Sequence, residues 1–279
     1  MAGLGSRLAF LHLGVSDEVR TRVERAREVE KTIIAGRGTI YDCRGQRNIL
    51  ALNLAVKDVC VDPKVIMEQN RMSDVVEPLA DLLDMNADEV AVRMNRPDRR
   101  FAYVQRFVKE DSAAAIRDRN LPGVFFQDAT IRYYPQNTFM CHVLGFVNHN
   151  GEGSAGVEQR FHAYLKGSPG LLEGQVDAFR QELVAQRDRY IPALQGANVE
   201  LTLDQNIQYM VEKALDEAMV EHHAKGAWLI VQRVRTGEIL AMAVRPAFNP
   251  NEFHLTPEAN RLNRAIGYVY EPGSTFKIS

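Results

Sequence analysis

Ser274 and Lys277 are the residues of this 279-residue chain whose types and spacing could carry out covalent chemistry. On a helix, positions three residues apart lie on one face, so the lysine amine can reach the serine hydroxyl. A lysine kept neutral by desolvation could take the hydroxyl proton while the serine oxygen attacks a carbonyl carbon. Pro272 and Gly273 suit the entrance of a helix, whose N-terminal end favours negative charge on the attacked oxygen. The pattern predicts acyl transfer through a serine; alone, S-x-x-K also occurs by chance, as a surface serine near a lysine.

The composition gives little support for nucleic-acid binding, a metal site or a disulfide framework. The 34 basic and 36 acidic side chains are well mixed and give a net charge of −2, so no basic surface is predicted for nucleic acid. The three cysteines, Cys43, Cys60 and Cys141, form no C-x-x-C pair and no zinc spacing with histidine, and their odd number argues against a disulfide framework. We expect three ordinary thiols, no metal site and no cofactor.

A helix and a β-hairpin are predicted upstream of Ser274. Residues 205–223 carry one apolar stripe at helical spacing, with Asp204 as the N-cap. The stripe consists of Ile207, Met210, Val211, Ala214, Leu215 and Ala218. Two apolar runs, 227–234 and 238–244, flank a short turn that contains Gly237 and predict an antiparallel hairpin.

The first two thirds of the chain predict alternating short helices and strands. Residues 17–31 alternate in charge and suit either a solvated helix or an exposed strand. The other expected elements are a helical pair over 73–94 with Ser73 and Asn86 as N-caps, strands over 101–108 and 124–134, helices over 111–120 and 157–165, and strands over 171–194. The character of the sequence changes near Gly196, where we place a domain boundary. The expected fold class is α+β.

The segments around Ser274 resemble the start of a penicillin-binding transpeptidase domain. Its elements occur here in order as TGEILAMA (Thr236–Ala243), PAFNPN (Pro246–Asn251), NRA (Asn263–Ala265) and EPGSTFK (Glu271–Lys277). By this resemblance, Ser274 is the acylated nucleophile and Lys277 is its general base.

Motifs farther upstream resemble the pedestal domain of class B penicillin-binding proteins. They are RGTIYD (Arg37–Asp42, with Gly38) followed by Gly45, RYYP (Arg132, Tyr133, Tyr134, Pro135), GVE (Gly156–Glu158) followed by LKGSPG, and the transpeptidase entry GANVELTLDQNIQ. Because four separated motifs occur in the family order, the chain is identified as a member of class B, and RLAFLHL (Arg7–Leu13) resembles the division-type members. Cys43 departs from the pattern, since the family usually has arginine there. The resemblance implies a dimerisation-type pedestal over residues 1–195 and the truncated start of an α/β serine transpeptidase domain over 196–279.

The charged residues of these pedestal motifs are expected to have a structural role. We predict that Arg37, Asp42, Arg132 and Glu158 form an ion-pair and hydrogen-bond network near the domain junction, and rank transmission of an activating signal second. Gly38, Gly45 and Gly156 are expected at turns or close backbone approaches.

The resemblance implies a peptidoglycan D,D-transpeptidase that acts in cell division and is acylated by β-lactams. Its expected partners are peptidoglycan stem peptides, the glycan polymerase and division proteins. Family members work on the periplasmic side of the cytoplasmic membrane, but residues 1–16 are too short to span it, so we expect the chain to lack the anchor. The S-x-N and K-(S/T)-G motifs of the family are also lacking, and we expect this chain alone to be inactive.

Two other functions remain open. One is a non-catalytic scaffold module that binds division proteins through the pedestal. The other is a serine β-lactamase or β-lactam sensor, which shares S-x-x-K, although the long pedestal argues against it.

Overall fold

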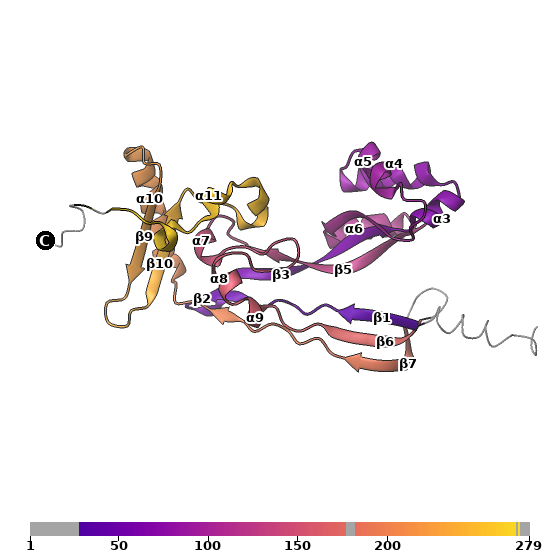
Figure 1. Ribbon diagram of the computed structural model, residues 1–279, viewed down its shortest axis with the longest axis horizontal. Coiled ribbons are helices and arrows are strands. Elements are labelled where there is room, and N and C mark those ends of the chain that lie inside the picture. Colours follow the sequence, from indigo (N-terminus) through magenta and orange to yellow (C-terminus); the bar gives the residue numbers. More distant parts are fainter. Residues whose placement is uncertain (1–27, 177–181, 272, 274–279) are drawn as a thin grey trace, which may run out of the picture. The chain divides into compact units, whose positions relative to one another are not determined.

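The structure is a computed structural model that describes residues 28–176, 182–271 and 273. The chain forms two compact units (Figure 1). The first combines the chain up to residue 35 with residues 167–196, and the second combines residues 36–166 with residues 197–279. The mixture of helices and strands confirms the predicted α+β class. The proposed division into residues 1–195 and 196–279 follows the order of the sequence motifs and stays a prediction.

The first unit is a three-stranded antiparallel sheet. Its strands are β1 (Glu28–Ile33), β6 (Gly170–Val176) and β7 (Glu182–Ile191), with β6 in the centre. Residues 28–31 of the charge-alternating segment therefore belong to a strand, while residues 17–27 lie outside the described residues. The predicted strands over 171–194 are confirmed where they are described.

The second unit is built on one long strand, β3 (Gly45–Val61). Antiparallel to β3 run β5 (Val124–Tyr133), β4 (Ala102–Val108) at its far end and β2 (Ile40–Asp42) at its start. The outer edge of β2 pairs in parallel with β8 (Val199–Glu200). Residues 40–42 and 199–200, far apart in sequence, thus lie in one sheet.

Four helices gather at the far end of β3, as Figure 1 shows. They are α3 (Pro63–Glu68), α4 (Met72–Leu83), α5 (Ala87–Met94) and α6 (Glu110–Asp118). Their apolar faces pack on the sheet in a core that includes Val59, Leu79 and Val104. Asn86 caps α5 as predicted, because its side chain accepts from the Asp88 N–H. Ser73 is not an N-cap: Met72 packs against the core, and α4 begins there.

A second core lies at the start of β3. It buries Ile40, Leu50, Tyr134, Leu144 and Leu165. Around it stand three short helices, α7 (Cys141–Leu144), α8 (Gly156–Arg160) and α9 (His162–Leu165). The single helix expected over 157–165 is therefore wrong, because non-helical backbone angles at Phe161 divide it in two.

The remaining part of the second unit contains the predicted helix and hairpin. Helix α10 (Gln205–Glu221) is capped by Asp204, whose carboxylate accepts from two N–H groups of the first turn. Strands β9 (Ala227–Gln232) and β10 (Ile239–Arg245) pair antiparallel and cover its buried side. Of the predicted stripe, Val211 and Leu215 are buried, whereas Met210 is 61% exposed. The short helices η1 (Pro250–Leu255), α11 (Glu258–Arg261) and α12 (Arg264–Gly267) follow.

Candidate functional site

The predicted nucleophile and base, Ser274 and Lys277, lie outside the described residues, but the chain leading to them is described. Helix α12 is capped by Asn263, whose side-chain oxygen accepts from the Ala265 N–H at 3.2 Å. Beyond it, the rings of Tyr268 and Tyr270 meet Trp228 of β9 edge-on, with centroids 5.6 and 5.8 Å apart. The approach to the S-x-x-K segment is therefore anchored on the hairpin.

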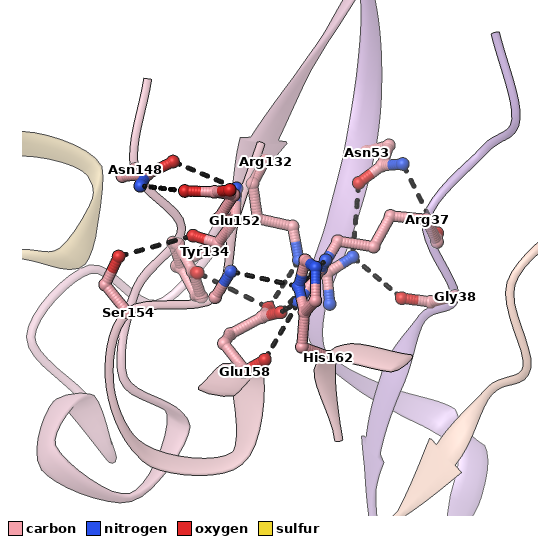
Figure 2. Close-up of polar contacts among 11 residues, drawn as sticks. Arg37, Gly38, Asn53, Arg132, Tyr134, Asn148, Glu152, Ser154, Glu158 and His162 are labelled. Atoms are coloured by element: carbon pink, nitrogen blue, oxygen red, sulfur yellow. Dashed lines mark hydrogen bonds and ion pairs between the residues drawn. The ribbon is translucent and has the colours of Figure 1, made fainter. Parts of the chain in front are cut away.

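Two arginines converge on Glu158, which is fully buried in α8 (Figure 2). Arg37 donates from Nε to Glu158 Oε2 at 2.7 Å and from Nη2 to the Glu158 carbonyl at 3.0 Å. Arg132 on β5 donates from Nε to Glu158 Oε1 at 2.6 Å. The Arg37 side chain is 8% exposed, Arg132 is 4% exposed and Glu158 is 0% exposed, so both ion pairs are buried. The structure brings together these three members of the predicted network.

The fourth predicted member, Asp42, lies elsewhere, and that part of the prediction is wrong. Its buried carboxylate accepts from the Arg44 N–H at 2.8 Å and from Asn48 Nδ2 at 2.7 Å. Asp42 ends β2, so its side chain closes the turn into β3, where Gly45 has a positive φ of 62°. The physical reason is local: an aspartate at a turn finds its partners among the next few residues.

Tyr134 connects the network to the transpeptidase part of the second unit. Its hydroxyl donates to Glu158 Oε1 at 3.4 Å, and burial together with the negative charge of Glu158 raises the pKa of Tyr134. Its backbone N–H and carbonyl both pair with the side-chain amide of Asn251 at 3.0 Å. Pro135, the next residue of the motif, begins an exposed turn. The PAFNPN loop thus contacts the RYYP motif directly.

Gly38 and Gly156 occupy close approaches, as predicted. The Gly38 carbonyl accepts from Arg132 Nη1 at 2.8 Å, and a Cβ on Gly38 would lie 1.9 Å from the Ala197 carbonyl oxygen. Gly156 has a φ of 56°, and a Cβ there would lie 2.4 Å from the Val143 oxygen. Neither position accommodates a side chain without movement of the backbone.

His162 and Asn53 complete the network and were not predicted from the sequence. His162 Nδ1 lies 3.2 Å from Arg37 Nη1 and 3.1 Å from the Gly153 N–H. Both neighbours are donors, so this nitrogen must be an unprotonated acceptor. Burial, and then the positive charges of Arg37 and Lys166, lower the pKa of His162.

The spacing of the sequence could have indicated that His162 belongs to the Glu158 network, but nothing in the sequence indicated this for Asn53. His162 follows Glu158 by four residues, the spacing at which helical side chains meet. Asn53 accepts from Arg132 Nη1 at 3.2 Å and donates to the Arg37 carbonyl at 3.3 Å. It lies within a long strand, with no turn or motif to mark it.

Further contacts join the segment after RYYP to the chain that precedes Ser274. His142 Nε2 lies 3.0 Å from the Asn260 carbonyl, which can only accept, so Nε2 carries the proton and Nδ1 can accept from the Cys141 thiol at 3.3 Å. Burial lowers the pKa of His142. The Phe248 N–H in turn points at Cys141 Sγ at 3.5 Å. The pedestal and the transpeptidase segments therefore share an interface within the second unit.

Comparison with known proteins identifies both parts of the chain. Residues 32–201 match the penicillin-binding protein dimerisation domain, and residues 227–279 match the penicillin binding protein transpeptidase domain. The chain belongs to the class B penicillin-binding proteins.

Relatives and solved structures agree with this family. The chain is 32% identical to peptidoglycan D,D-transpeptidase FtsI of Escherichia coli over 99% of its own length and 47% of the relative's. It is 31% identical to stage V sporulation protein D of Bacillus subtilis over 87% of its length and 37% of the relative's. The fold resembles penicillin-binding protein PBP2 of Helicobacter pylori, solved as a complex with MreC, with a TM-score of 0.62, 20% identity, and coverage of 81% of this chain and 44% of that one. The chain thus spans about half the length of the curated relatives.

The family assignment confirms the predicted pedestal followed by the start of a transpeptidase domain. Among residues 28–176, 182–271 and 273, no helix is both long and apolar enough to cross a membrane. The same residues contain no group of three or more His, Cys, Asp or Glu side chains placed to hold a metal ion.

Proposed function

We propose that the protein containing this chain is a peptidoglycan D,D-transpeptidase that serves cell wall synthesis during division. The observation that carries the proposal is the match of residues 227–279, which include Ser274 and Lys277, to the transpeptidase domain. The dimerisation-domain match over residues 32–201 favours a penicillin-binding protein over a β-lactamase or sensor.

The proposed reaction proceeds through an acyl-enzyme on Ser274. The serine oxygen attacks a peptide carbonyl carbon of one stem peptide while neutral Lys277 takes the hydroxyl proton. The C–N bond breaks, and the proton leaves with the departing amine. The amine of a second stem peptide then attacks the ester carbonyl and releases Ser274, so that one peptide bond replaces another. A β-lactam would be attacked by the same oxygen and would remain attached as the ester.

In this proposal the pedestal motifs serve to hold the second unit together. Glu158 neutralises one of two buried arginines and accepts from both, and Arg132 also binds the Gly38 carbonyl. Gly38 allows close contact with the backbone of Ala197, and Gly156 allows close contact with the backbone of Val143. The Tyr134 N–H donates to the Asn251 side chain and so connects the network to the PAFNPN loop. Asp42 contributes separately by closing the β2–β3 turn.

Partners and location are proposed by analogy with relatives. The likeness to PBP2, whose structure was solved with MreC, supports a pedestal that binds assembly proteins such as the glycan polymerase and division proteins. The names of the relatives support a site of action on the periplasmic side of the cytoplasmic membrane, where peptidoglycan is cross-linked.

The test is covalent labelling by a fluorescent penicillin of a full-length protein that contains this segment. Ser274→Ala should abolish the label, since no other oxygen replaces the nucleophile. Lys277→Arg should lower the labelling rate by about 10²–10⁴-fold, because a guanidinium stays charged and cannot accept the proton. Ser279→Ala is the matched control and should label normally. Labelling that persists at the same rate in Ser274→Ala would refute the proposal.

A further inference from the structure

Glu212 is a buried carboxylate in α10 that contacts both the pedestal and the hairpin. It is 8% exposed and lies in the middle of the helix, whereas Glu217 on the same helix faces solvent. Its Oε1 accepts from the backbone N–H of Met140 at 2.9 Å, and its Oε2 accepts from Arg245 Nη2 at 3.1 Å. A charged group buried away from solvent must be fully partnered, so these contacts determine where its neighbours can lie.

On one side, Glu212 holds an unusual backbone position. Met140 has a φ of 55°, in the left-handed region that residues with a Cβ seldom adopt, and it is the residue from which α7 begins. Such a conformation persists where the surroundings fix it. The Glu212 carboxylate supplies a fixed acceptor for the N–H at that position. Helix α7 carries Cys141 and His142, which contact Phe248 and Asn260.

On the other side, Glu212 fixes the end of β10. Arg245, the last residue of β10, also binds Asp216 through Nε at 2.5 Å and Nη2 at 2.9 Å. Hydrogen bonding to Asp216 and the charge of Glu212 raise the pKa of Arg245 and keep it charged. The strand ends at this arginine, and the PAFNPN loop follows at once.

Gln208 extends the contact along β10. Its side-chain amide donates to Glu212 Oε1 at 2.8 Å and to the Met242 carbonyl at 2.9 Å, and its oxygen accepts from the Met242 N–H at 2.8 Å. The amide therefore occupies the place of a neighbouring strand at Met242. Asn263, which caps α12, lies within 3.5 Å of the Met242 sulfur and 3.4 Å of the His142 carbonyl. The same cluster thus reaches the helix before the Ser274 segment.

We propose that Glu212 is a positioning residue: through its two oxygens it holds the pedestal segment at Met140 in register with the end of β10, and so places the chain that leads to Ser274. The effect on Ser274 rests on the proposed function, whereas the link between Met140 and β10 does not. Oε1 accepts from the Met140 N–H and from Gln208, whereas Oε2 accepts from Arg245, so a substitution that keeps one oxygen can break the Arg245 contact alone.

The first test measures amide hydrogen exchange in this chain. Glu212→Ala should raise exchange about 5- to 30-fold both in residues 140–145 and in residues 242–248, as expected for the loss of one to two buried hydrogen bonds on each side. Glu212→Gln keeps an oxygen that can accept from the Met140 N–H but loses the charge that faces Arg245. It should restore protection at residues 140–145 and leave residues 245–248 faster than wild type.

Two controls separate positioning from general loss of stability. Val211→Ala destabilises the same helix by core truncation, and it should raise exchange in α10 and β10 without a matching rise at residues 140–145. Glu217→Ala removes an exposed carboxylate and should change none of these segments. The proposal is overturned if residues 140–145 are unaffected in Glu212→Ala, or if Val211→Ala at equal loss of stability reproduces the same pattern.

The second test measures the rate of acylation by a fluorescent penicillin in a full-length protein that contains this segment. Glu212→Ala should lower the acylation rate constant about tenfold or more at saturating penicillin, because small displacements of a catalytic group are costly. Glu212→Gln should recover part of that rate, and Glu217→Ala should match wild type. Persistent labelling in Ser274→Ala would defeat the proposed function. Abolished labelling in Ser274→Ala with a wild-type rate in Glu212→Ala would defeat the positioning role alone.

Discussion

Glu158 pairs with two buried guanidinium groups and neutralises one of their two positive charges. Glu158→Gln would leave Arg37 and Arg132 buried without that charge, and breaking a buried pair from one side commonly costs about 3–5 kcal/mol. We therefore expect a loss of that order in the free energy of unfolding, measured by urea denaturation.

The matched control for this prediction is Glu217→Gln, which removes an exposed carboxylate paired with Lys213 on α10. It should change stability by less than about 0.5 kcal/mol. Equal effects of the two substitutions would show that the buried network contributes no more than a surface pair.

The three cysteines differ in reactivity because they differ in burial. Cys43 is exposed, although partial burial and the charge of Asp204 raise its pKa, whereas Cys60 and Cys141 are buried and burial raises the pKa of each to about 12. The thiolate is the reactive form, so we expect iodoacetamide to modify Cys43 in the folded chain and all three thiols in denaturant. Cys43→Ser should remove the native reaction. Rapid native modification of Cys141 would contradict the described packing.

At the scale of the element, Gly156 decides how α8 begins. Gly156→Ala would place a Cβ 2.4 Å from the Val143 oxygen and 2.7 Å from the Gly145 nitrogen, at a φ of 56°. We expect a loss of more than about 2 kcal/mol, since steric overlap adds to the strain of a left-handed residue.

Gly151→Ala is the control that isolates the strain. Gly151 has a φ of 80°, but a Cβ there would meet nothing within 4 Å. It should cost about 1–2 kcal/mol. A thermal melt in which both variants lose the same stability would show that the contact at Gly156 relaxes freely.

Elements with strong local signals were predictable from the sequence, and those decided by distant contacts were not. Asn86 and Asp204 were predicted as caps because a short polar side chain before an apolar stripe has one obvious partner, the next N–H groups. The break at Phe161 has no such signal.

The same distinction explains the candidate site. The charges of Arg37, Arg132 and Glu158 were recognisable as a set through the family resemblance, yet Asp42 was assigned to that set although a turn satisfies it locally. Asn53 and Glu212 join partners roughly 16 to 80 residues away, and no periodicity in one sequence marks such pairs.

At the scale of the whole molecule, two histidines, the buried His142 and the partly buried His162, make stability depend on pH. Burial lowers the pKa of His142 and of His162, so each binds its proton more weakly in the folded chain than in the unfolded one. Their contribution is complete above the unfolded pKa of about 6.5 and is lost as the pH falls through the lower, folded values.

We therefore expect the urea midpoint to fall between about pH 7 and about pH 5. The double substitution His142→Gln with His162→Gln should flatten that dependence, even if it lowers stability at every pH. A pH profile unchanged by the double substitution would assign the titration to other groups.

The pairing of β2 with β8 has a consequence for how the protein is made. Ile40 and Tyr41 of β2 find their parallel partners only at Val199 and Glu200, and the Gly38 backbone lies against Ala197. During synthesis on the ribosome, the edge of β2 must wait while roughly 160 residues are added, about 10 to 30 seconds at ordinary elongation rates. The helices around the far end of β3 need no residue beyond 133 and can fold in that interval. We therefore expect β2 to pair with β8 last among the strands of this sheet. Until then, the unpaired edge of β2 is the part of the sheet most exposed to pairing with a wrong strand.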